Sequence, residues 1–242
     1  MRVAVVTDIH ANLHALDAVL AAVQGARPDA VWCLGDVVGY GPQPSSCCSL
    51  AEQHASIGLV GNHDLGVLGE VDLADFAPEA AEAARWTAGI LSAADRAYLG
   101  ALEPSAITEH AALYHGSPRE PVWEYVLGPE AALAALEDSP RPLVLVGHTH
   151  VAMAVGLGET LEGGLAPEGT AIDLGSADRW LLNPGSVGQP RDGDPRAAWL
   201  LLDLDRGRAE FKRCTYPIER TQQEILEAGL PEGLATRLAE GV

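Results

Sequence analysis

Short apolar runs alternate with alanine-rich amphipathic segments through the first 150 residues of the chain. The runs are too short for helices and are rich in β-branched residues or leucine, which predicts buried strands. They are Arg2–Val6, Ala30–Leu34, Ser56–Val60, Ala111–Tyr114 and Leu143–Val146. The amphipathic segments predict helices over Leu13–Gln24, Ser45–His54, Pro78–Ile90, Ala93–Leu102 and Glu130–Glu137. Such alternation is typical of a layered α/β fold.

The pattern changes after His150, where short apolar runs are separated by Gly, Pro and Asp turns. These runs predict a meander-like β region with strands at Val151–Leu157, Thr170–Leu174, Trp180–Leu182, Ala197–Leu204 and Arg208–Cys214. The segment Gly156–Gly169 is rich in Gly and Glu without periodicity and predicts a mobile loop. Helical spacing returns in Ile218–Leu226 and Leu230–Glu240, which predicts two outer helices.

Length and composition are those of a globular protein with a sizeable core. The chain has 242 residues, 48% of them hydrophobic, which excludes disorder and a small disulfide scaffold, and we expect a single domain over residues 1–242. Its net charge of −19 disfavours nucleic acid polymers and anionic lipid as partners. The apolar stretch near the start is too short for a signal peptide or membrane span, so we expect a cytoplasmic protein. The four cysteines form no C-x-x-C pair and are expected to be reduced packing residues.

Polar side chains follow each of the first five predicted strands. These residues are Asp8, His10, Asp36, Asn62, His63, His115, His148 and His150. Ligands collect at the carboxyl ends of strands in open α/β sheets, because the loops there converge on one crevice. A lone histidine at a strand end is usually a surface residue, but here five of the eight histidines stand at the ends of predicted strands. Within Asp8-x-His10 and His148-x-His150 the spacing of two puts both side chains on one face of an extended segment, which predicts a divalent metal site.

The ordered motifs Asp8-x-His10, Gly35-Asp36, Gly61-Asn62-His63-Asp64, His115 and Gly147-His148-x-His150 resemble those of the calcineurin-like metallophosphoesterase superfamily. The later segment Asn183–Arg191 resembles its small bacterial and archaeal phosphodiesterase branch. The resemblance implies a four-layer αββα sandwich with a dimetal site at the carboxyl ends of the strands. It also implies two ligand sets that share Asp36 as a bridge: Asp8, His10, Asp36 and His150 for the first ion, and Asp36, Asn62, His115 and His148 for the second.

The donor types narrow the choice of metal. Carboxylate, amide and imidazole donors without a thiolate suit Mn²⁺, Fe or Zn²⁺ better than Ca²⁺. We favour Mn²⁺, and Ni²⁺ also remains open. Two ions roughly 3.5–4 Å apart can share a water and lower its pKa, which gives a bridging hydroxide that attacks phosphorus. With two carboxylates and that hydroxide the centre carries a charge of about +1, which favours a singly charged diester without excluding a monoester.

The leaving alkoxide of a diester needs a proton, which requires a general acid opposite the attacking hydroxide. His63 is the candidate, because it follows the ligand Asn62 in the same turn and the resemblance implies that it stays uncoordinated. The alternative is that His63 is a surface residue or only supports the ligands. Asp64 either orients the His63 imidazole or caps the segment Leu65–Leu68.

The candidates for substrate binding are Asn12, Tyr40 and Arg191. Each has an ordinary alternative: a helix N-cap for Asn12, core packing for Tyr40 and a solvated loop charge for Arg191. Similar protein phosphatases and dinucleoside tetraphosphatases carry an Arg where this chain has Tyr40, which puts monoesters and polyphosphates in doubt, although Arg191 can compensate. We expect Tyr40–Pro44 and Ser117–Pro121 to wall the pocket. Tyr40 and Trp123 offer stacking surfaces for a base, Trp123 being more readily explained by packing.

The function expected from these residues is that of a metal-dependent hydrolase, a phosphodiesterase that cleaves a small phosphodiester such as a cyclic nucleotide. Two alternatives stay open. One is a phosphomonoesterase or a nucleotide or polyphosphate phosphatase, and the other is a non-catalytic scaffold of the same fold that binds proteins. A nuclease acting on long DNA is disfavoured by the net charge of −19. The sequence does not decide whether the chain forms a homo-oligomer.

Overall fold

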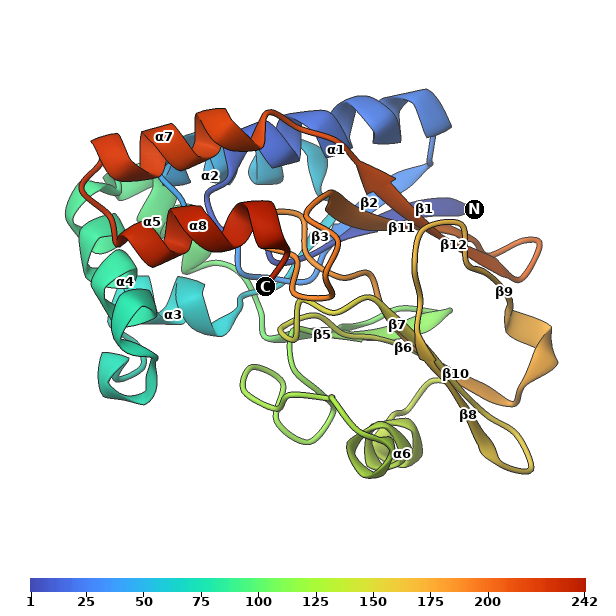
Figure 1. Ribbon diagram of the computed structural model, residues 1–242. Coiled ribbons are helices and arrows are strands. Elements are labelled where there is room, and N and C mark those ends of the chain that lie inside the picture. Colours follow the sequence, from blue (N-terminus) through green and yellow to red (C-terminus); the bar gives the residue numbers. More distant parts are fainter.

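Two six-stranded sheets lie face to face in the computed structural model, which describes residues 1–242 (Figure 1). The first sheet contains, in spatial order, β3 (Ile57–Gly58), β2 (Ala30–Cys33), β1 (Arg2–Val6), β11 (Ala197–Asp203), β12 (Arg208–Cys214) and β9 (Ala171–Asp173). The second contains β4 (Ser105–Ile107), β5 (Ala111–Tyr114), β6 (Leu143–Leu145), β10 (Arg179–Asn183), β7 (Met153–Leu157) and β8 (Leu161–Leu165). No helix in the structure combines the length and apolarity needed to cross a membrane.

Helices cover the outer faces of both sheets. The first sheet is covered by α1 (Leu13–Ala26) and α2 (Pro44–His54), with α7 (Ile218–Glu227) and α8 (Glu232–Glu240) beside them, while α6 (Pro129–Asp138) covers the second (Figure 1). The remaining helices, α3 (Asn62–Leu68), α4 (Pro78–Ile90) and α5 (Ala93–Leu99), pack together at one end, with the short turn η1 (Leu73–Asp75) beside α4. A second short turn, η2 (Leu174–Ser176), follows β9. The expected four-layer αββα sandwich is confirmed.

The central strands are buried on both faces, which explains their continuous apolar runs. In β1, Val3 and Val5 face the cluster between the sheets, whereas Ala4 and Val6 face the helices on the other side. Side chains alternate along a strand, so a strand between two covered faces needs apolar residues at every position. This explains why the sequence shows no polar alternation in these runs.

Parallel pairing brings the ends of the key strands to one edge of the sandwich. Strand β1 pairs with β2 and β2 pairs with β3, all in parallel, and β5 and β6 are parallel in the second sheet. The carboxyl ends of parallel neighbours lie side by side, so the loops that follow them also meet. The polar residues after these five strands therefore come together from both sheets.

The second half of the chain does not form the expected meander. Strands β7, β8 and β10 join the second sheet, and β9, β11 and β12 join the first, so the two groups lie in different layers. Strand β10 pairs with β7 on one side and in parallel with β6 on the other. These pairings link distant parts of the chain, which local turn signals cannot reveal.

The prediction of a mobile loop over Gly156–Gly169 is also wrong, since this segment contains the edge strand β8. This strand pairs with β7 from Met153 opposite Leu165 to Leu157 opposite Leu161, and most of its side chains are exposed. Backbone pairing forms such an edge strand without an apolar face, so no sequence pattern marks it. The strand β4 and the helix α3 also have no counterpart among the predicted elements.

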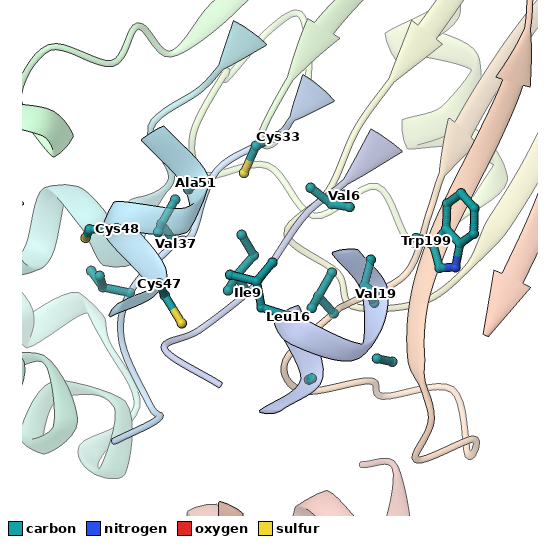
Figure 2. Close-up of a cluster of buried hydrophobic side chains, with 14 of the residues drawn as sticks. Val6, Ile9, Leu16, Val19, Cys33, Val37, Cys47, Cys48, Ala51 and Trp199 are labelled. Atoms are coloured by element: carbon teal, nitrogen blue, oxygen red, sulfur yellow. The ribbon is translucent and has the colours of Figure 1, made fainter. Parts of the chain in front are cut away.

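The four cysteines are unpaired, and three of them are core residues. Figure 2 shows Cys33 at the end of β2 and Cys47 and Cys48 on α2, among apolar side chains such as Leu16 and Val37. Burial raises the pKa of the Cys33 thiol to about 12 and those of Cys47 and Cys48 still further. These residues therefore act as small apolar side chains, as the sequence predicts.

Because a raised pKa keeps these thiols protonated at neutral pH, we expect them to resist alkylation in the folded protein. Cys33, Cys47 and Cys48 should react with iodoacetamide at pH 8 at least about 100-fold more slowly than in guanidinium chloride. Cys214, which is only partly buried, should be the fastest thiol. Mass spectrometry of wild type and of Cys214→Ser measures both rates, and rapid labelling of folded Cys214→Ser would contradict the buried placement.

Candidate metal centre

Seven donor side chains from five loops meet at the edge where the two sheets end. Asp8 and His10 follow β1 and Asp36 follows β2, while Asn62 begins α3. His115 follows β5, and His148 and His150 follow β6. All seven are buried. The structure thus brings together every residue that the sequence proposed as a metal ligand.

The donors form two groups that share one carboxylate. Within each group the candidate ligand atoms lie within 4.8 Å of one another: Asp8, His10, Asp36 and His150 in the first, and Asp36, His115 and His148 in the second. Asn62 joins the second group, because its Oδ1 lies 3.2 Å from Nε2 of His115. This arrangement matches two adjacent ion sites bridged by Asp36.

Hydrogen bonds to backbone carbonyls orient three of the imidazole rings. Nδ1–H of His10 donates to the carbonyl of Val38 at 3.1 Å, that of His115 to Leu34 at 2.9 Å, and that of His150 to Gln189 at 2.6 Å. A carbonyl only accepts, so Nδ1 must carry a proton in each ring. Nε2 then faces the centre, which is the usual arrangement of histidines that ligate a metal.

Several candidate ligand atoms face one another at close range. Nε2 of His10 lies 3.0 Å from Nε2 of His150, and Nε2 of His115 lies 3.2 Å from Nδ1 of His148. Oδ1 of Asp8 and Oδ2 of Asp36 are buried without a hydrogen-bond partner. Buried acceptors that face one another repel, and a cation between them removes the repulsion. The residues present therefore fit two divalent ions.

The electrostatic environment also favours positive charge. Burial alone would raise the pKa of Asp8 and of Asp36, but His150 and His115 respectively, with other nearby histidines, hold both carboxyls well below their usual range. Burial lowers the pKa of His148 to about 3, so its ring is neutral at pH 7. His115 differs: burial is outweighed by the charge of Asp36, which raises its pKa to about 9. The centre thus stabilises a cation beside Asp36.

The backbone around the donors is held in an unusual conformation. Asp8, His10, Asp36, His148 and His150 all have positive φ angles between 49° and 64°. Seven of the eight non-glycine residues with positive φ lie in these loops. The left-handed conformation costs about 1–2 kcal/mol for each such residue, so the surrounding structure must impose it. The strain lies where the candidate ligands are.

Two further residues fix the orientation of Asp8, and the sequence analysis did not single them out. Oδ2 of Asp8 accepts hydrogen bonds from Oγ1 of Thr7 and from the backbone N–H of His148. The hydroxyl of Ser186 donates to the carbonyl of Asp8 at 2.8 Å. These contacts leave Oδ1 as the free oxygen toward the centre. The only feature of the sequence that could have identified Thr7 is its position next to Asp8.

The segment Asn183–Arg191 supports the metal-binding loops from the other side. Nδ2 of Asn183 donates to the carbonyl of Gly147 and to Oγ1 of Thr149, which braces the turn between the two histidines. The backbone N–H of Arg191 donates to the carbonyl of His150. The segment that carries the resemblance to one branch of the family thus holds His148 and His150 in position.

His63 lies beside the centre but outside both donor groups. Its ring packs against Tyr40, His10 and Phe76, with ring centroids 4.4, 4.8 and 5.0 Å away. Nδ1 is buried without a partner, so Nε2 is the nitrogen available to a bound molecule. Burial lowers the pKa of His63 to about 4. Asp64 does not orient the ring: its carboxylate accepts from the N–H groups of Gly61 and Val38, which is the capping alternative.

Two of the three proposed substrate residues line a cleft beside His63, and the third does not. The cleft has a volume of about 420 Å³ and includes Tyr40, His63, Trp123 and Arg191. The guanidinium of Arg191 donates to the Tyr40 hydroxyl at 3.3 Å. Asn12 instead caps α1, accepting from the N–H of Ala15 and donating to the carbonyl of Gly188.

The walls of the cleft differ in part from expectation. Tyr40 and Trp123 line it, but the segment Ser117–Pro121 does not, and Phe76, Tyr125 and Arg237 contribute instead. Phe76 and Arg237 come from parts of the chain without a recognisable motif. Their place in the wall depends on how α4 and α8 pack, which the sequence pattern does not specify.

The chain belongs to the calcineurin-like phosphoesterase superfamily, whose domain matches residues 1–207. It is 35% identical to an uncharacterized protein, MJ0912, of Methanocaldococcus jannaschii, over 99% of this chain and 98% of the other. A metallophosphoesterase from Sphaerobacter thermophilus is 42% identical over 100% of this chain and 99% of its own, with a TM-score of 0.89. A hypothetical protein, PH1004, of Pyrococcus horikoshii shares the fold at 18% identity and a TM-score of 0.81, over 100% and 98% of the two chains.

These comparisons confirm the family and the fold expected from the motifs. Membership of a phosphoesterase superfamily indicates hydrolysis of phosphate esters, and the paired donor groups agree with the use of divalent metals in this family. The match ends at residue 207, so helices α7 and α8 lie beyond the matched domain. The relative of known structure nevertheless covers them, since it aligns with the whole chain.

We predict that Gly61→Ala disrupts the centre although it replaces no candidate ligand. A Cβ at this position would overlap Oδ1 of Asp36, the oxygen that accepts from the backbone N–H of His63. Displacing the bridging carboxylate should weaken Mn²⁺ binding about 10–100-fold and lower the free energy of unfolding by about 1–3 kcal/mol.

The matched control is Gly89→Ala in helix α4, where an added Cβ meets no atom within 4 Å. This change should leave Mn²⁺ binding intact and stabilise the helix by up to about 1 kcal/mol. Calorimetric titration and thermal denaturation measure both quantities. Wild-type Mn²⁺ affinity in Gly61→Ala would show that Asp36 does not depend on this close approach.

Proposed function

We propose that this protein is a metal-dependent phosphodiesterase that hydrolyses a small phosphodiester, with His63 as the general acid. The observation that carries the proposal is that His63 lies between the metal centre and the cleft without belonging to either donor group. Its neighbour Asn62 is a candidate ligand, so the two side chains reach the centre and the cleft from one turn of α3. A bound ester would therefore have both a metal centre and a proton donor beside it.

Seven residues would hold the two ions: Asp8, His10, Asp36, Asn62, His115, His148 and His150. When bound, the ions would activate water toward neutral pH and neutralise charge on the phosphate oxygens. The mixture of carboxylate, amide and imidazole donors supports Mn²⁺ as the preferred metal, with Fe, Zn²⁺ and Ni²⁺ as the other candidates. The absence of thiolate ligands argues against a structural zinc site.

His63 would donate its proton from Nε2 to the departing oxygen. Burial disfavours its charged form, while the nearby Asp36 carboxylate favours it. A phosphate bound in the cleft adds further negative charge next to the ring and raises the pKa of His63 when substrate is present. The protonated form would then be stabilised in the complex, where the proton is needed.

Arg191 and Tyr40 would bind the non-bridging oxygens of the phosphate. The Arg191 guanidinium uses Nε and Nη2 in contacts with Gln189 and Tyr40, which leaves Nη1 free for a ligand. The backbone carbonyl of Gln189 also accepts from Nδ1 of His150. Gln189 therefore fixes the position of Arg191 relative to the metal centre. At the scissile phosphate, one guanidinium next to a neutral phenol suits a singly charged diester, which supports diesters over monoesters.

The direct test is hydrolysis of a panel of esters with Mn²⁺, Fe²⁺, Zn²⁺ or Ni²⁺. We expect bis-p-nitrophenyl phosphate and at least one 2′,3′- or 3′,5′-cyclic nucleotide to be cleaved, and p-nitrophenyl phosphate to have a lower kcat/KM. A preference for the monoester would favour a phosphatase instead. Cleavage of no ester with any metal would favour the non-catalytic scaffold.

The role of His63 is tested in the same assay through the leaving group. His63→Ala should lose about 10²–10⁴ in kcat on thymidylyl-thymidine, which releases an alkoxide, but less than about tenfold on thymidine 5′-(p-nitrophenyl phosphate). The second substrate releases a stable phenolate that needs little protonation. The exposed His110→Ala is the control. Equal losses on the two substrates would remove His63 from this role.

A further inference from the structure

The C-terminal helices reach the cleft through a small apolar cluster. Leu234 and Leu238 of α8 and Ile225 of α7 pack with Tyr40 and with Ala83 of α4. This packing puts Arg237 in the lining of the same cleft as His63 and Arg191. An arginine beyond the matched family domain therefore lines the same cleft as His63.

Arg237 has donors to spare for a ligand. Its ionic contact within the protein is with Glu79, where Nη2 and Oε2 lie 3.6 Å apart, and its side chain is 31% exposed. A guanidinium carries five N–H donors, so one long ion pair leaves most of them free. Arg191 likewise keeps Nη1 free, as described above. Two guanidinium groups with unused donors thus share one cleft.

The lining of the cleft is less acidic than the rest of the protein. The chain carries a net charge of −19, yet in the cleft the charges of Asp75 and of the terminal carboxylate at Val242 are matched by those of Arg191 and Arg237. Guanidinium groups in a region without excess negative charge can bind an anion that the rest of the acidic surface would repel. Since Arg191 lies next to the centre and has one free nitrogen, Arg237 is available for a second anionic group.

Three further residues that line the cleft are aromatic. Phe76 and Trp123 pack edge to face with ring centroids 5.5 Å apart. Tyr125 stacks on His148 at 3.9 Å and is 49% exposed. Exposed aromatic faces bind planar rings, and nucleic acid bases in particular stack on them.

We propose that Arg237 forms a subsite for a second phosphate, while Arg191 binds the scissile one, and that the preferred substrate is a nucleotide-type diester whose base contacts Phe76, Trp123 and Tyr125. This inference rests on the proposed phosphodiesterase function and names its substrate class. The scissile phosphate would lie at the metal centre, and the additional phosphate would accept hydrogen bonds from the free donors of Arg237.

Three chromogenic diesters separate the contributions of the base and the second phosphate. They are methyl p-nitrophenyl phosphate, thymidine 5′-(p-nitrophenyl phosphate), and the latter compound with an added 3′-phosphate. All three release p-nitrophenolate from a diester phosphorus. We expect kcat/KM to rise at least about tenfold when the nucleoside is added, and about tenfold again with the 3′-phosphate.

Variants assign each increment to a wall of the cleft. Arg237→Met should abolish most of the tenfold preference for the 3′-phosphate, and Trp123→Leu should reduce the preference for the nucleoside. Glu79→Gln removes the ion pair while keeping the arginine, and Arg220→Met removes an exposed charge from the neighbouring helix α7. Both controls should keep the wild-type preference for the 3′-phosphate.

The proposal is overturned if the 3′-phosphate gives no advantage, if Arg237→Met keeps the full preference, or if Glu79→Gln loses as much of it. Calorimetric binding keeps the test independent of turnover. Thymidine 3′,5′-bisphosphate should bind about tenfold more tightly than thymidine 5′-monophosphate, and Arg237→Met should remove the difference. If no diester is cleaved but this difference in affinity is found, the proposed hydrolysis fails while the anion subsite stands. Equal affinities contradict the subsite.

Discussion

Electrostatic repulsion among buried donor atoms is the feature on which the organisation of this protein depends. Nitrogen atoms of His10 and His150 face each other at 3.0 Å, and unpaired carboxylate oxygens of Asp8 and Asp36 lie in the same enclosed space. Burial makes such contacts between unpaired acceptor atoms costly. Two cations turn these unfavourable contacts into favourable ones. The fold therefore gives up some stability in order to hold a preorganised metal centre.

The parallel strands and the covered faces of the two sheets supply stability that offsets this cost. Strands β1, β2, β5 and β6 are apolar on both sides, which anchors the loops that follow them rigidly. The loops can then hold five candidate ligands in the left-handed conformation. Outside the centre, Thr7, Asn183 and Ser186 direct hydrogen bonds at the ligands and the turns that carry them. The positions of the candidate ligand atoms are thus controlled by backbone geometry as much as by the side chains.

The sequence predicted the features that depend on local patterns. Apolar runs located β1, β2, β5 and β6, and the Asp and His residues after them are the ones that meet in space. Edge strand β8 escaped prediction because its residues Leu161–Leu165 have no buried face. Tyr125 and Arg237 escaped because their place in the cleft depends on tertiary packing. Asp64 shows an intermediate case, since its motif was evident while its capping role required the hydrogen bonds to Gly61 and Val38.

The central claim, that the seven donors enclose two ions bridged by Asp36, is tested most directly by anomalous diffraction from crystals of Mn²⁺-loaded protein, with metal content measured on the same sample. The account predicts two manganese ions per chain, each beside one of the two donor groups, and loss of both from Asp36→Asn. Fully loaded protein with no ordered ion between these side chains, or unchanged metal content in Asp36→Asn, would contradict it.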